Sequence, residues 1–336
     1  MYATIKKQAH AGLLAALCLL LTIPLAHAQT FCVFDPEGAQ GEGFSAARDY
    51  ALEARRWGVT LDLKVYTDEG VVVEDFKARQ CDMMVITGLR ARQFNAFTGT
   101  IDSIGGIENY AELRKLMDLI GSQKLDQYMT SGPYEIDAIF PLGAGYAFIN
   151  DRRINTLSKA AGKRIGVLDW DKTQAMLVEA VGAQPVLSDL TNYGGRFNNG
   201  QVDIIVAPLI LYRPFELYKG LGSRGAIARF PILQLTAQMV SWHDRFPPDF
   251  GAESRRYSSK QVDHAFAYIR LQEADVDEKY WMHVPSSDRE DYVKLMRDAR
   301  LALARSGFYD RRMLGILKRV RCSSEPDDAE CAQDGE

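Results

Sequence analysis

The chain has 336 residues, of which 47% are hydrophobic and 25% are charged, and its formal charge at pH 7 is -4. These fractions are typical of globular proteins and exclude a disordered or collagen-like chain. The length suggests two domains, and the acidic balance excludes a nucleic-acid binder that relies on a basic surface. One apolar run alone is long enough to suggest a membrane segment, and it lies at the N-terminus, which excludes a channel or pump.

Residues 1–28 have the three parts of a secretory signal peptide. Lys6 and Lys7 form the basic segment, residues 12–24 form the apolar segment, and Ala26-His27-Ala28 supplies the small residues that signal peptidase requires. We therefore expect cleavage after Ala28 and export to the periplasm, rather than retention as an uncleaved anchor. Cleavage removes two lysines and no acids, so the formal charge of the mature chain is -6.

The mature chain keeps four cysteines: Cys32, Cys81, Cys322 and Cys331. An even number in an exported protein indicates disulfides, and four cysteines allow three pairings. We favour Cys32–Cys81, which would tie the first strand to another strand of its sheet, together with Cys322–Cys331, which would close a short loop. The alternative is a set of buried free thiols.

Short apolar runs alternate with helical segments after the signal, which is the α/β pattern. The predicted strands are residues 31–34, 59–66, 83–86, 163–168, 184–187 and 204–206. The predicted helices are a segment capped by Ser45 and ending near residue 56, then 72–78, 173–181, 259–272, 287–306 and 310–319. Extended segments at 136–150 and 232–242 would cross between two lobes and act as a hinge.

One segment recurs at a constant offset of 121 residues. Residues 76–85 and 197–206 share Phe, Gln, Asp and Val at corresponding positions, and both continue into an apolar strand. With the repeated order of elements, this match indicates two lobes of similar design. We predict a first lobe of 29–140 with 232–260, a second lobe of 141–231, helices of 261–321 packing across the lobes, and a frayed acidic tail of 322–336.

The sequence lacks the common catalytic and metal-binding motifs. The three histidines of the mature chain, His243, His264 and His283, have no neighbours at zinc-ligand spacing. There is no nucleophile elbow, phosphate-binding loop or complete dinucleotide-binding glycine motif. We therefore expect no enzyme, metal or cofactor, although the 44 acidic residues leave a carboxylate pair possible.

Ligands of open parallel sheets bind beyond the carboxyl ends of the strands. This rule selects the loops at residues 35–43, 87–92, 169–173 and 208–213. From these loops and the first crossing strand, we predict the following ligand-binding residues: Thr87, Arg90, Arg92, Tyr146, Trp170, Asp171, Thr173, Pro208 and Tyr212.

Each candidate has a structural alternative. Trp170 could form a stacking wall over a ligand or pack against its own lobe, and Thr173 could serve only as a helix N-cap. The arginines could pair with an anionic ligand or lie on the surface, and the two tyrosines could face the cleft or fill the core.

Two passages of the sequence carry a family resemblance. The first is residues 63–83, and the second is Gly162-Lys163-Arg164-Ile165-Gly166-Val167, followed by Gly182-Ala183-Gln184-Pro185-Val186 and Gly200-Gln201-Val202-Asp203. From about residue 31 to 208, the chain resembles the solute-binding subunits of tripartite ATP-independent periplasmic (TRAP) transporters, the DctP-like family. More narrowly, it is similar to a divergent branch of solute-binding proteins, some of which carry efflux-related names.

The resemblance implies a two-lobed, periplasmic-binding-protein-like fold of type II, in which each lobe is a mixed sheet with flanking helices and a helical segment follows at the C-terminus. Its carboxylate anchors are missing, however. The arginine that clamps the substrate carboxylate in that family corresponds to Gly166, a second arginine falls near Tyr146-Ala147, and an asparagine falls near Ala207. We therefore expect a different ligand or a different anchor, such as Arg90.

The resemblance implies a periplasmic protein that captures a small molecule between two lobes and delivers it to an inner-membrane permease. It implies no nucleic-acid partner and no membrane span after signal cleavage. The alternatives are a sensor or efflux-accessory binding protein on the same fold, and a periplasmic enzyme.

Overall fold

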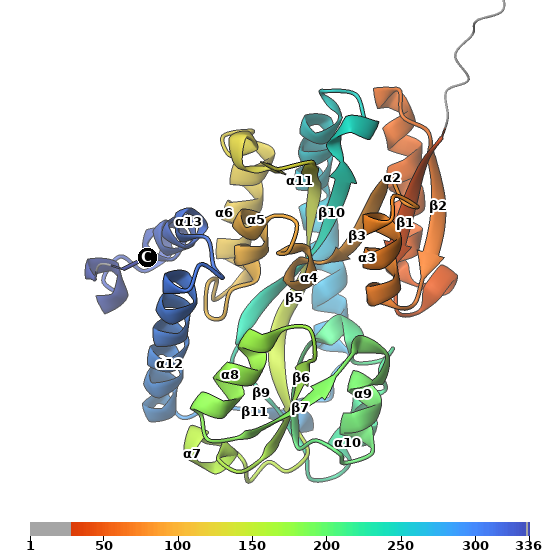
Figure 1. The fold of residues 1–336 in the computed structure, drawn as a ribbon. Helices are drawn as coiled ribbons and strands as arrows, with labels where there is room; N and C mark the ends of the chain where they lie inside the picture. Colours follow the sequence, from red (N-terminus) through yellow and green to blue (C-terminus); the bar gives the residue numbers. More distant parts are fainter. Residues whose placement is uncertain (1–27, 334) are drawn as a thin grey trace, which may run out of the picture.

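The computed structural model describes residues 28–333 and 335–336, so the predicted signal segment lies outside the described residues except for Ala28. Two α/β lobes lie end to end, and the last two helices, α12 (Ser286–Arg305) and α13 (Arg311–Ser324), lie on one side of them (Figure 1). Within the described residues, no helix is long and apolar enough to cross a membrane.

One sheet of eleven strands extends through both lobes. Its main path has the order β2-β1-β3-β10-β5-β8-β6-β7, and β4, β9 and β11 pair off this path. The strands are β1 (Gln29–Phe34), β2 (Leu61–Tyr66), β3 (Met83–Thr87), β4 (Thr130–Ser131), β5 (Tyr134–Ile149), β6 (Arg164–Leu168), β7 (Gln184–Ser188), β8 (Ile204–Pro208), β9 (Ala226–Ala228), β10 (Leu233–Trp242) and β11 (Trp281–Met282).

Helices cover both faces of the sheet. The first lobe contains α2 (Glu42–Ala54), α3 (Glu69–Lys77), α4 (Gly88–Ala91), α5 (Ala96–Gly99) and α6 (Tyr110–Gly121). The second lobe contains α7 (Leu157–Ala160), α8 (Lys172–Ala180), α9 (Leu190–Asn198) and α10 (Leu217–Leu221). The C-terminal helices are α11 (Phe250–Ala274), α12 (Ser286–Arg305) and α13 (Arg311–Ser324).

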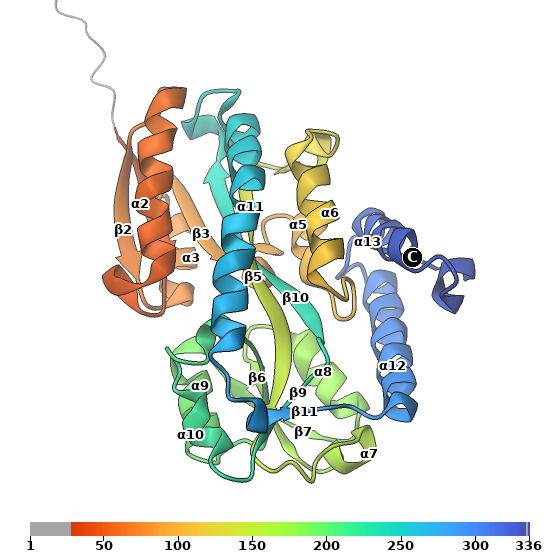
Figure 2. The ribbon, with the colours of Figure 1, turned by 180° about the vertical axis from the view of Figure 1, so that it is seen from behind.

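Strand β5 joins the two lobes. Its first part pairs antiparallel with β10, and its last five residues, from Gly145 to Ile149, pair antiparallel with β8. The pairing with β10 slips by one residue beside Pro141 and Gly143, and Gly143 has a φ of 102°, which favours glycine. This bulge marks the point where the sheet passes from one lobe to the other, and α11 crosses the same point on the back of the sheet (Figure 2).

Each lobe has its own apolar core. In the first lobe, Phe76, Met84 and Leu113 are fully buried on one face of the sheet, and Phe31 and Tyr50 on the other. In the second lobe, the core is built around buried side chains that include Phe148, Phe197 and Ile205.

The predicted repeat is confirmed at the level of single hydrogen bonds. Asp82 accepts the backbone N–H of Thr30 at 2.9 Å, and Asp203 accepts the backbone N–H of Arg164 at 2.9 Å. Each aspartate thus joins the start of one strand to the start of the neighbouring parallel strand. The phenylalanines at the start of the repeat, Phe76 and Phe197, are both fully buried.

Both predicted disulfides, Cys32–Cys81 and Cys322–Cys331, are present in the structure. The expectation of a frayed acidic tail is wrong for part of it. Glu336 forms ion pairs with Arg300 and Arg321, and the side chains of all three residues are nearly inaccessible to solvent. Buried arginines without partners would be costly, so the acids of the tail fold back onto them.

Two helix starts also differ from the predictions. Ser45 does not cap the first helix, which begins at Glu42, because the Asp35 carboxylate at the end of β1 accepts the backbone N–H of Phe44 at 3.0 Å. The helix predicted at 259–272 begins earlier, at Phe250. The sequence analysis missed its first part because the buried face there is polar and includes Ser254 and Arg255.

A candidate ligand-binding cleft between the lobes

A cavity of about 690 Å³ lies between the two lobes. Residues at the carboxyl ends of β1, β3, β6 and β8 line it, together with residues of β5, β10 and α11. These are the strand ends that the sheet rule selects. A volume of this size is within the range of small-molecule sites.

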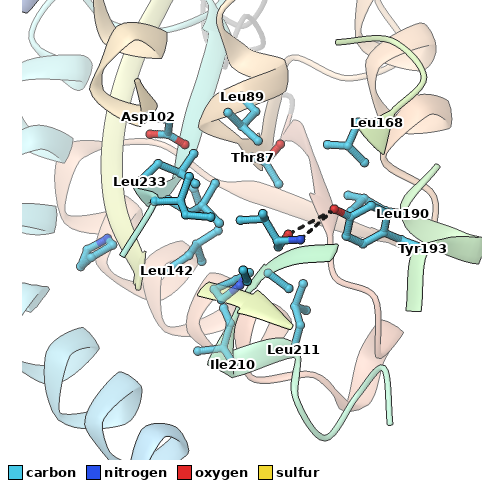
Figure 3. Close-up of a pocket in the computed structure, with 18 of the residues that line it drawn as sticks. Thr87, Leu89, Asp102, Leu142, Leu168, Leu190, Tyr193, Ile210, Leu211 and Leu233 are labelled. Atoms are coloured by element: carbon cyan, nitrogen blue, oxygen red, sulfur yellow. Dashed lines mark hydrogen bonds between the residues drawn. The ribbon is translucent and has the colours of Figure 1, made fainter. Parts of the chain in front are cut away.

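The cavity wall is mainly apolar. Figure 3 shows leucines from both lobes converging on one space. Leu89 comes from the first lobe, Leu142 from the bulge of β5, and Leu168 and Leu211 from the second lobe. Leu190, Leu233 and Ile210 complete this apolar group. Such a wall favours a ligand with a substantial hydrocarbon surface.

Tyr193 braces the second lobe under this wall. Its hydroxyl lies 3.1 Å from the carbonyl oxygen of Gly166 and accepts the backbone N–H of Val206 at 3.2 Å. Burial raises the pKa of Tyr193 to about 12, so the hydroxyl stays protonated and can donate to Gly166. The tyrosine therefore links β6 to β8.

Gly166 has no room for a side chain. A Cβ atom at this position would lie 2.9 Å from Cγ2 of Ile205 and 3.3 Å from Cε2 of Tyr193. This is the position where the resemblance would place a carboxylate-binding arginine. The surrounding side chains occupy the space that such a residue would need.

The charged lining residues that the structure describes are all acidic, and no described lysine or arginine side chain lines the cavity. Three of the acids are buried: Asp35, Asp102 and Asp171. Three others lie on the outer parts of the lining and are exposed: Glu37, Glu42 and Asp49.

Two of the buried acids are held by the protein itself. Asp35 accepts the backbone N–H groups of Glu37 and Phe44 at 2.9 and 3.0 Å. Asp171 caps α8, where it accepts the backbone N–H of Thr173 at 3.1 Å, and lies 3.9 Å from Nη1 of the buried Arg92.

Asp102 differs from these two. It is 1% exposed, and it accepts two hydrogen bonds from Thr236 of β10, at 3.0 Å from the backbone N–H and 2.6 Å from the hydroxyl. Burial raises the pKa of Asp102 to about 7, and the Thr236 hydrogen bonds and the more distant Arg92 only partly oppose this effect. No cationic side chain of the described residues forms an ion pair with it.

The structure places the two predicted arginines on protein partners. Nε of Arg90 donates to the buried Glu69 at 3.0 Å, and its guanidinium lies 4.4 Å from the ring centre of Trp170. Arg92 donates from Nε and Nη2 to the carbonyl oxygen of Gly99, each at 3.1 Å. Binding of an anion by either arginine stays a prediction.

Of the predicted residues, Thr87, Asp171, Thr173 and Pro208 line the cavity. Arg90, Arg92, Tyr146, Trp170 and Tyr212 are absent from its lining. Tyr146 donates from its hydroxyl to Glu273 at 3.2 Å on the other side of the hinge, and Tyr212 is 4% exposed in the core of the second lobe.

Sequence reasoning missed Asp102, Tyr193 and the leucines. Asp102 ends a single turn of 3-10 helix, Thr100–Asp102, in a stretch to which we assigned no element. One aspartate among so many acids carries no signal. The leucines had a signal, since three of them, Leu89, Leu168 and Leu211, fall in or beside the loops that the sheet rule selects.

Two contacts join the lobes beside the cavity. Arg90 and Arg92 come from the first lobe, and Trp170 and Asp171 come from the loop after β6 in the second lobe. Arg90 contacts the ring of Trp170, and Arg92 forms the buried ion pair with Asp171. Both contacts require the lobes to be close together.

The family comparisons agree with this architecture. A family model described as solute-binding protein AdeT 1/2 matches residues 52–336. The probable solute-binding protein AdeT1 of Acinetobacter baumannii is 46% identical over 304 residues, which cover 90% of this chain and 100% of that protein. The probable solute-binding protein AdeT2 of the same organism is 28% identical over 233 residues and covers 69% and 98%.

Solved structures share the fold at low identity. A TRAP periplasmic solute-binding protein from Ralstonia eutropha H16, with bound (S)-2-acetolactate, matches with a TM-score of 0.68 and 12% identity over 87% of this chain and 98% of that one. One from Rhodoferax ferrireducens, with bound malonate, matches with 0.67 and 11% over 89% and 100%. These likenesses confirm the two-lobed fold of type II.

Proposed function

Because the chain belongs to the AdeT 1/2 family of solute-binding proteins, we propose that it captures a small molecule between its two lobes in the periplasm and delivers it to an inner-membrane transporter. It would do so without a chemical step. One observation carries this proposal, namely the cavity that lies between two separately packed lobes and is lined by both of them.

The mechanism follows from differential binding. A ligand that touches both walls of the cavity binds the closed arrangement better than the open one, and it shifts the equilibrium by that difference in affinity. Beside the cavity, the Arg90–Trp170 and Arg92–Asp171 contacts would form on closure and break on opening. The bulge of β5 at Pro141 and Gly143 supports a hinge at this place.

The domain limits that we predicted stay a proposal as well. The two-lobe division of 29–140 with 232–260 and of 141–231 is supported by the position of the β5 bulge. Helix α11 continues from Phe250 to Ala274 without a break. Its buried first half contacts the first lobe through Ser254 and Arg255, so the whole helix would move with that lobe.

A thermal-shift screen of residues 29–336 tests the function. The candidates are carboxylates, amino acids, sugars, amines and aminoglycosides. A ligand that binds only the folded protein raises its free energy of unfolding by mass action, by about 2.7 kcal/mol at a hundredfold excess over the dissociation constant. The melting temperature rises as a result. A protein that is folded and free of carried-over ligand, but that responds to none of these classes, would contradict the proposal.

A further inference from the structure

The charge of the cavity lining restricts the ligand. All charged lining residues that the structure describes are carboxylates, three of them buried. In a water-poor cavity the attraction or repulsion between charges is much stronger than in bulk water. An anionic ligand would therefore meet repulsion from the wall, with no lysine or arginine of the described lining to offset it.

The two arginines nearest to the cleft loops are already bound to groups of the protein. Arg90 is bound to Glu69 and covered by the Trp170 ring, and Arg92 is bound to Gly99 and Asp171. The Gly166 position is closed by its packed neighbours. A carboxylate ligand would have to break one of these arrangements before it found a partner.

Asp102 offers the opposite charge at the right place. It lies in the cavity wall with Thr87, Leu89 and Leu233 around it (Figure 3). Each carboxylate oxygen accepts one hydrogen bond from Thr236, and an ionised carboxylate has about four acceptor positions. It therefore keeps acceptor capacity for a donor from the ligand, and a buried carboxylate is stabilised strongly by a paired cation.

We propose that the cavity takes a small molecule with a largely apolar body and one cationic amine group, and that Asp102 is the counter-ion of that group. The inference rests on the proposed function, because it names the class of solute for the same cavity. The leucines would contact the hydrocarbon body, and the ammonium group would donate to Asp102.

Three probes with one apolar body and different head groups test this directly: 3-phenylpropylamine, 3-phenylpropanol and 3-phenylpropanoate. We expect the amine to bind the unsubstituted protein tightest and the carboxylate weakest, measured by titration calorimetry at pH 8. A charge-assisted hydrogen bond predicts an advantage of about tenfold or more for the amine over the alcohol. This comparison needs no variant.

The Asp102→Asn variant locates the charge. It should lose the amine advantage, about tenfold or more in affinity, and keep the affinity for 3-phenylpropanol. Asp49→Asn is the matched control, because Asp49 also lines the cavity but is exposed on α2. It should change amine affinity by less than about threefold, as expected for a surface charge.

The outcomes separate the two proposals. If 3-phenylpropanoate binds tightest, or if the alcohol binds as well as the amine, the assigned ligand class is wrong although the protein still captures solutes. If none of the three probes binds while another class in the thermal-shift screen does, the inference is overturned in the same way. If nothing in the screen binds, the proposed function itself fails.

Discussion

Asp102 combines near-complete burial with hydrogen bonds from a single residue, Thr236. Its pKa of about 7 in the folded protein lies above the ordinary value of 3.8, so the folded state holds this proton more tightly than the unfolded state. The carboxyl therefore contributes most to stability below pH 3.8, and this contribution is lost as the pH rises from 3.8 through about 7.

The ligand-free Asp102→Asn variant should for this reason be more stable than the unsubstituted protein at pH 8. We expect a gain on the order of 1 kcal/mol or more, because one pKa unit corresponds to about 1.4 kcal/mol. The measurement is chemical denaturation of both proteins at pH 8 and pH 5, and the gain should shrink at pH 5. An equal loss of stability at both pH values would contradict the pKa assignment.

Amine binding should also depend on pH. The ammonium group prefers the ionised carboxylate, so affinity should rise between pH 6 and pH 8 in the unsubstituted protein and stay level in Asp102→Asn. Thr236 does not titrate, and Arg92 is the cationic group that partly offsets the burial of Asp102. The exposed His264 of α11 also lines the cavity, and it is present in both proteins, so the difference between them reports on Asp102. Titration calorimetry at both pH values checks this, and affinity that falls with pH would contradict it.

Gly166 tests how tightly the second lobe is packed beneath the cavity. Gly166→Ala places a methyl group 2.9 Å from Cγ2 of Ile205, so we expect a loss of about 1–3 kcal/mol from overpacking. Gly195→Ala is the control, because nothing lies within 4 Å of a Cβ there. Denaturation midpoints of the two variants test this difference. Equal stability would contradict it, because it would show that the neighbours of Gly166 move to make room for the methyl group.

The candidate site was partly predictable at the residue scale. The sheet rule found the loops, because loops at the carboxyl ends of parallel strands meet at one edge. It did not find which side chains face the cavity. Thr87 and Pro208 line it while Arg90 and Tyr212 do not, and that difference depends on how each short turn rotates its residues, which no spacing rule encodes.

At the scale of elements, apolar runs predicted the strands well, since a buried parallel strand is a short continuous apolar segment. Helix α11 shows the limit of this approach. Its first half is buried through Gly251, Ser254, Arg255 and Ser258, so the face that packs against the sheet contains no apolar repeat to detect.

Arg255 replaces hydrophobic packing with ion pairs in this helix. Its guanidinium lies 3.0 Å from Asp126 and 2.9 Å from Glu135, and its side chain is 4% exposed. Arg255→Ala should cost about 3–5 kcal/mol, because it leaves partly buried carboxylates without their partner. Arg256→Ala, at the neighbouring position, where the side chain is 42% exposed and pairs with Glu253, should cost less than about 1 kcal/mol.

Chemical denaturation of the two arginine variants checks this difference. Similar stability of the two would show that α11 is held by its apolar contacts alone. The same experiment tests why sequence periodicity missed the start of the helix.

At the scale of the whole molecule, the contacts between the lobes set how readily the cleft opens. Trp170→Ala removes the ring that covers Arg90, so the ligand-free protein should populate more of the open form. We expect a larger radius of gyration in solution scattering and a weaker apparent affinity for any ligand that needs closure. An unchanged radius and affinity would show that this contact does not bias the lobes.

The two-lobe design was predictable from the repeat at an offset of 121 residues. In both lobes, the aspartate of the helix–turn–strand junction accepts a backbone N–H from the neighbouring parallel strand. The way the lobes meet was not predictable. The Arg92–Asp171 ion pair and the fold-back of Glu336 onto Arg300 join residues far apart in the chain, and charge patterns in a sequence do not specify such pairs.

The central claim is that a solute closes the two lobes, and a distance between them tests it most directly. Spin labels at Leu52→Cys on α2 and Leu187→Cys on β7 suit this measurement, since both positions are exposed, at 59% and 57%. The four cysteines of the described chain are in disulfides and do not compete for the label. Pulsed electron–electron double resonance then reports the distance between the two labels with and without a ligand identified in the thermal-shift screen.

Saturating ligand should move this distribution to a shorter and narrower distance. The same distribution with and without a ligand that raises the melting temperature would contradict capture by closure of the lobes.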